Sequence, residues 1–129
     1  MNKYVIDAYA WIEYLVGSEA GDKVRTVLEE EDSEVYTCAV TLAEVISKTA
    51  REERDYESAY GVITGNSSMV DVDEELSKET GLLHAEMRKT GKDFGLADAY
   101  VLAVARRNNT KILTADMHFK DIKEAILIN

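Results

Sequence analysis

Two kinds of hydrophobic pattern alternate along the chain. Short apolar runs rich in Val, Ile and Tyr predict five strands, at residues 3–6, 34–39, 69–72, 111–114 and 125–128. Stretches with apolar residues at helical spacing predict helices at residues 8–16, 19–31, 41–54, 55–63, 74–89 and 96–107. Gly91 is expected to end the fifth of these helices. The alternation predicts an α/β fold, with one domain over residues 1–129 and a mostly parallel five-stranded sheet that carries helices on both faces.

Four acidic residues occupy special places in this pattern. Asp7 directly follows the first strand, and Asp116 follows the fourth. Glu44 is expected in the first turn of the helix after the second strand, and Asp98 opens the apolar helix 96–107. Only three residues join that helix to the fourth strand, so its start, with Asp98, should lie at the carboxyl edge of the sheet. With the strand order 3-2-1-4-5, strands one and four flank the point where open α/β sheets bind ligands. We expect all four acids to share one crevice there.

Each acid also has a purely structural interpretation. Thr41 and Glu44 match a helix capping box, and Asp7 could cap the helix that follows it. Asp98 suits the positive end of a helix, and Asp116 could belong to a turn or an N-cap. These interpretations do not explain why all four residues fall on one edge. Crowded carboxylates repel unless a cation lies among them, and oxygen ligands favour a hard divalent ion. The pattern therefore indicates a metal-dependent enzyme that acts on a phosphate-containing substrate.

The charge of the chain bears on its partners. Asp plus Glu total 25 against 15 Lys plus Arg, which gives a formal net charge of −10. Non-specific binding to nucleic acid normally comes from a basic face. A nucleic-acid substrate would therefore require bound metal ions or a local basic patch to offset the negative potential of the protein. A basic protein partner would also be attracted by this charge.

The remaining composition points to a cytoplasmic protein without a membrane segment. The single cysteine, Cys38, excludes an intramolecular disulfide, and the most apolar stretch, residues 99–105, is too short to span a bilayer. Cys38 is expected to be buried, because it lies in an apolar strand. His84 and His118 lack zinc-ligand spacing, and a surface role is expected for His118. In the glycine-bounded segment 91–95, Lys92 could reach a phosphate.

Four segments of the chain resemble the PIN-domain ribonucleases, and among them the small VapC-type toxins of toxin–antitoxin pairs. The segments are VIDAYAW at residues 5–11, TLAEV at residues 41–45, LADAYVLAVA at residues 96–105, and ILTAD at residues 112–116 with Phe119. Each is weak alone, but the four in this order, in a chain of this length, are rather specific.

The resemblance implies a function and a set of site residues. It implies Mg²⁺ or Mn²⁺ held by four carboxylates and supported by the hydroxyl group of Thr114. It also implies RNA as substrate, a homodimer, and a small cognate antitoxin whose basic residues enter the acidic pocket. The four acids expected in catalysis and metal binding are Asp7, Glu44, Asp98 and Asp116.

Two other classes of protein require acidic residues that this chain lacks. A phosphoaspartate phosphatase needs a second Asp two residues after Asp7, where the chain has Tyr9. A receiver domain needs adjacent acids near the first strand and is likewise disfavoured. A stand-alone PIN nuclease of RNA processing and an inactive, metal-stabilised interaction module stay open. The sequence does not identify the RNA, the position of cleavage or the number of metal ions.

Overall fold

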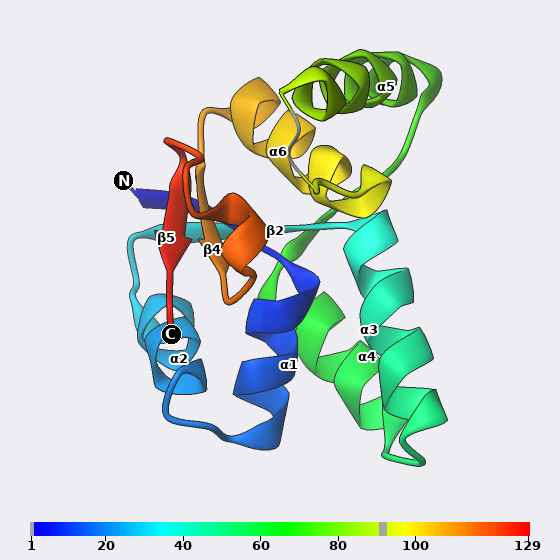
Figure 1. The fold of residues 1–129 in the computed structure, drawn as a ribbon. Coiled ribbons are helices and arrows are strands. Elements are labelled where there is room, and N and C mark those ends of the chain that lie inside the picture. The colour runs from blue at the N-terminus through cyan, green and yellow to red at the C-terminus, as the bar shows by residue number, and fades with distance from the viewer. Residues whose placement is uncertain (1, 91–92) are drawn as a thin grey trace.

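A computed structural model describes residues 2–90 and 93–129, and its fold is shown in Figure 1. Five strands form one sheet in the order β3-β2-β1-β4-β5, and all four neighbouring pairs are parallel. The predicted strand order is therefore confirmed. Gly91 and Lys92, for which a helix end and a phosphate contact were expected, lie outside the described residues. The strands are β1 (Asn2–Ile6), β2 (Ser33–Cys38), β3 (Ser68–Val70), β4 (Lys111–Thr114) and β5 (Ala125–Leu127).

Helices cover both faces of the sheet, as predicted (Figure 1). Successive strand residues point to opposite faces, so Val5 packs in the core beneath α5 and α6, whereas Ile6 packs in the core of α1, α2, α3 and α4. No helix in the described part of the chain is both long and apolar enough to cross a membrane. The helices are α1 (Ala8–Val16), α2 (Gly21–Glu29), α3 (Ala39–Arg51), α4 (Tyr56–Asn66), α5 (Glu74–Lys89) and α6 (Leu96–Asn108), with a short 3₁₀ helix, η1 (Met117–Phe119).

The start of α3 differs from the prediction. The helix begins at Ala39, directly after β2, with Cys38 as its N-cap and without a side-chain capping bond. Thr41 and Glu44 therefore lie inside the helix, and Glu44 is in the second turn instead of the first. The predicted capping box is wrong, because the chain enters α3 without the loop that such a box requires. Cys38 itself is buried, as expected.

The tight turn that follows α6 determines at which edge of the sheet this helix begins. Asn109 adopts a left-handed conformation with φ of 52°, and the Thr110 N–H donates to the carbonyl of Ala105 at 2.9 Å. The chain then passes directly into β4. Because α6 has 13 residues and is therefore about 20 Å long, its first turn lies at the far, carboxyl edge of the sheet. Asp98, in that first turn, is placed as the sequence predicted.

Candidate active site

The site is built on two neighbouring parallel strands. Ile6 of β1 is in register with Leu113 of β4, and the Asp7 N–H donates to the Leu113 carbonyl at 3.1 Å. Asp7 and Thr114 therefore leave the sheet side by side, and Asp116 follows two residues later. This edge holds the ends of segments that are more than a hundred residues apart in the sequence.

Asp7 is the most deeply placed of the four acids. Its side chain is 3% exposed and caps α1, with Oδ1 accepting the Ala10 N–H at 2.8 Å. The Thr114 hydroxyl donates to its Oδ2. Burial, with smaller contributions from the carboxylates of Asp116 and Asp98, raises the pKa of Asp7 to about 7, although the hydrogen bonds from Thr114 and Ala10 oppose this rise. Asp7 thus lies where an ionised carboxylate needs a nearby cation.

Thr114 links two of the acids. Besides donating to Asp7, its fully buried Oγ1 accepts the backbone N–H of Asp116 at 2.9 Å. One hydroxyl group therefore fixes both the side chain of Asp7 and the main chain that carries Asp116. The family resemblance predicts a supporting role for Thr114, and these two hydrogen bonds are the contacts through which it would act.

We expect Thr114→Val to lower the free energy of unfolding by about 1–3 kcal/mol, because Val leaves the Asp116 N–H without its acceptor and Asp7 without a donor. Thr114→Ser, which retains the hydroxyl group, is the matched control and should lose much less. Urea unfolding of both variants in EDTA measures the difference. Equal stability of the Val and Ser variants would show that the hydroxyl group has no such role.

Asp98 and Asp116 approach one another across the edge. Asp98 Oδ2 accepts the Gly95 N–H at 3.0 Å at the start of α6, and Asp116 Oδ1 accepts the His118 N–H at 2.9 Å at the start of η1. Partial burial raises the pKa of Asp98, and the neighbouring Asp116 adds to that effect. Asp98 and Asp116 therefore cap α6 and η1, and the same caps hold both carboxyl groups close to one another.

His118 lies beside these two acids and is exposed, as the sequence predicted. Its Nδ1 is 3.3 Å from Asp116 Oδ1 and 3.7 Å from Asp98 Oδ2. Ligand atoms of Asp98, Asp116 and His118 all lie within 4.8 Å of one another, a spacing that one metal ion can bridge. Spacing along the sequence gave no indication of this, because the contact with Asp98 joins residues 20 positions apart through the fold.

Glu44 lies at the margin of the site. It is exposed on α3 and is not in the group of three whose ligand atoms lie within 4.8 Å of one another, and neither is Asp7. Protein atoms around its carboxyl group nevertheless remove part of its water and raise its pKa, and the charges of Asp98 and Asp116 raise it further. The structure thus brings Asp98 and Asp116 together with His118, while Asp7 and Glu44 are coupled to them by charge.

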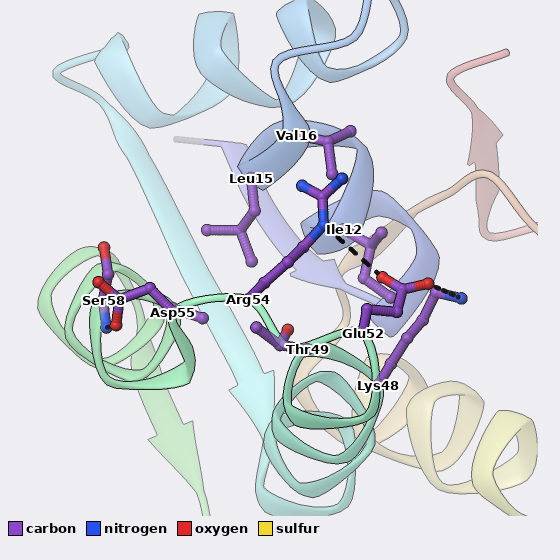
Figure 2. A pocket seen from close by; sticks show the side chains of 10 residues that line it. Ile12, Leu15, Val16, Lys48, Thr49, Glu52, Arg54, Asp55 and Ser58 are labelled. Carbon is purple, nitrogen blue, oxygen red and sulfur yellow. Dashed lines mark hydrogen bonds and ion pairs between the residues drawn. The ribbon is translucent and has the colours of Figure 1, made fainter.

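A separate hollow lies between α1, α3 and α4 (Figure 2). It has a volume of about 350 Å³, with Ile12, Leu15 and Val16 forming an apolar wall. At its rim, Glu52 pairs with Lys48 at 3.2 Å and lies 3.9 Å from Arg54. None of the four acids lines this hollow. The candidate site is therefore the carboxyl edge of the sheet and not this hollow.

A family comparison identifies the family to which the chain belongs. The model of the PIN domain matches residues 4–125 of the chain. The chain belongs to the PIN-domain family. The family resemblance inferred from the four sequence segments is thereby confirmed, as is the single PIN-type fold. No curated protein sequence matches the chain.

Solved structures similar to this PIN domain include components of toxin–antitoxin complexes. One from Klebsiella pneumoniae is 14% identical with a TM-score of 0.75, and covers 98% of each chain. The VapBC2 complex of Rickettsia felis, bound to a promoter DNA fragment, is 16% identical with a TM-score of 0.74, over 97% of this chain and 96% of that one. A Mycobacterium tuberculosis VapC toxin described as cleaving the sarcin–ricin loop is 15% identical with a TM-score of 0.74, over 94% and 95%. At these identities the likeness establishes the fold alone.

Proposed function

We propose that this PIN domain is a metal-dependent endoribonuclease that hydrolyses RNA phosphodiester bonds, and that it is the toxin of a toxin–antitoxin pair. The observation that carries the proposal is the convergence of Asp98, Asp116 and His118 within 4.8 Å, beside the buried Asp7, in a chain of the PIN family. The VapC-like fold of its structural neighbours supports the same function.

The residues at the edge suit a divalent ion. Their carboxylate oxygens are the donors that Mg²⁺ and Mn²⁺ accept, and Asp7, whose pKa is raised mainly by burial and also by the charges of Asp116 and Asp98, would be stabilised in its ionised form by a cation. Asp7, Asp98 and Asp116 would hold the ion, and Glu44 would complete the cluster from α3. When bound, the ion supplies a more acidic water and neutralises charge that develops on the phosphoryl oxygens.

Other residues of the chain hold the carboxyl groups of the site in position. Thr114 keeps Asp7 and Asp116 in fixed relation, and the Gly95 N–H holds Asp98 at the start of α6. The carboxyl group of Glu44 interacts electrostatically with Asp98 and Asp116, so it would add its negative charge to the field around a bound ion. With a net charge of −10, the protein depends on the cation to bring an RNA phosphate to this edge.

The direct experiment incubates the purified chain with RNA in Mn²⁺, in Mg²⁺ and in EDTA. The proposal expects cleavage that requires a divalent ion and that returns when the ion is restored. A chain that binds the ion without cleaving any RNA in a broad transcript pool would instead be the inactive interaction module. Cleavage at full rate in EDTA would contradict metal dependence.

We further propose a small antitoxin partner, a homodimeric toxin and action in the cytoplasm. A basic side chain of the antitoxin would enter the acidic edge and compete with the ion, because an arginine can pair with a carboxylate through two hydrogen bonds.

Asp116→Asn should then weaken the complex at least about tenfold, and so should replacement of that arginine. Co-purification with the protein encoded by the neighbouring gene identifies the partner. Replacing the arginines of that partner one at a time then measures how much each contributes to the affinity of the complex. If binding ignores both changes, a stand-alone PIN nuclease is the better account.

A further inference from the structure

His118 presents one ring nitrogen to two acids of the site. Nδ1 lies 3.3 Å from Asp116 Oδ1 and 3.7 Å from Asp98 Oδ2. Its position follows from η1, in which the His118 N–H donates to the Asp116 side chain. The imidazole is therefore held on the same short turn as one acid and directed at the other.

These separations fit a shared ion. Two donor atoms at about 2.1 Å from an octahedral ion are about 3.0 Å apart when adjacent and about 4.2 Å apart when opposite. The separations of 3.3 and 3.7 Å exceed the value for adjacent donors by about 0.3 and about 0.7 Å. The nitrogen of His118 and one oxygen from each acid can thus bind one ion with only small movements.

The other ring nitrogen lies near a further carboxylate. His118 Nε2 is 3.8 Å from Asp93 Oδ2, which is beyond hydrogen-bonding distance, and the side chain of Asp93 is 90% exposed. Metal-ligating histidines commonly direct their second nitrogen toward a carboxylate, which fixes the tautomer and the orientation of the ring. Asp93 would have to move about 1 Å closer to Nε2 to take that role.

We propose that His118 is a metal ligand through Nδ1, so that the site has mixed nitrogen and oxygen donors and favours Mn²⁺ over Mg²⁺. The inference rests on the proposed metal-dependent function and specifies the ion. Imidazole nitrogen binds transition ions more readily than it binds Mg²⁺, whereas carboxylate oxygens accept both. Loss of the nitrogen should therefore weaken Mn²⁺ binding by roughly tenfold or more and change Mg²⁺ binding by less than about threefold.

The test is electron spin-echo envelope modulation of Mn²⁺ bound to the full chain, with no RNA and no turnover. A directly bound imidazole gives strong ¹⁴N modulation, which should be present in the parent chain and absent in His118→Gln. His84→Gln on α5 is the matched control and should retain the modulation. Replacing all histidine with ¹⁵N-histidine should also remove it, without any variant that could misfold. Calorimetric titration with Mn²⁺ and Mg²⁺ gives the affinity changes.

The outcomes separate this inference from the proposed function. Bound Mn²⁺ without histidine modulation would overturn the role of His118 and leave a nuclease with oxygen ligands alone. Failure of the parent chain to bind either ion would overturn both. Modulation that persists in His118→Gln and disappears in His84→Gln would likewise contradict the assignment.

Discussion

Asp98→Asn should reduce RNA cleavage by a factor on the order of 10²–10³ or more and leave the protein folded. Asn retains an oxygen that can accept the Gly95 N–H, so the start of α6 should keep its cap. It removes one charge from beside Asp116, which weakens metal binding but also relieves repulsion. Cleavage rates in Mn²⁺ and thermal melts in EDTA measure the two effects separately.

Asp55→Asn is the matched control for this change. Asp55 caps α4 by accepting the Ser58 N–H at 3.0 Å, so the substitution makes the same chemical change at another helix start. The account expects its activity to stay within about twofold of the parent chain. Full activity of Asp98→Asn would remove Asp98 from the site, and a large loss of stability in EDTA would make its role structural.

The second large effect concerns pH. Because the pKa of Asp7 is raised from 3.8 to about 7 in the folded protein, the folded chain binds one more proton than the unfolded chain between those values. The free energy of unfolding without metal should therefore fall as pH rises from about 4 to about 7, by up to about 1.4 kcal/mol per pH unit from this group. The raised pKa values of Asp98 and Glu44 act in the same direction.

Asp7→Asn should remove much of this pH dependence and should be more stable than the parent chain at pH 8 in EDTA. The amide oxygen can still accept the Ala10 N–H, so the cap of α1 is kept. Urea unfolding at pH 5 and pH 8 provides the comparison. If the variant and the parent chain lose stability equally over that range, Asp7 is not the group that titrates.

Much of the fold could be predicted because its strands and helices alternate in the sequence itself. The positions of Asp7 and Asp116 followed from the ends of apolar strands, and that of Asp98 from the short link between α6 and β4. These inferences need only chain direction and parallel pairing, and the strand order of the structure bears them out.

Other features depend on contacts that local sequence does not contain. Thr41 and Glu44 match a capping box, yet α3 begins at Ala39 because the chain turns directly from the buried end of β2. His118 is exposed, as expected, but nothing in the local sequence indicated that η1 places its Nδ1 3.7 Å from Asp98 Oδ2. The proximity of His118 and the precise start of α3 both result from tertiary packing, which a periodic pattern cannot encode.

The source of the oxygen atom added to the product distinguishes hydrolysis by a metal-activated water from attack by the ribose hydroxyl group. RNA is cleaved by the Mn²⁺-loaded chain in ¹⁸O-labelled water, and the new ends are analysed by mass spectrometry, with EDTA and Asp98→Asn reactions alongside. The account predicts one ¹⁸O atom in each newly formed terminal phosphate, because water is the nucleophile, and no products in either control reaction. Unlabelled 2′,3′-cyclic phosphate ends, formed equally well in EDTA, would show attack by the ribose hydroxyl and would contradict a metal-dependent hydrolase.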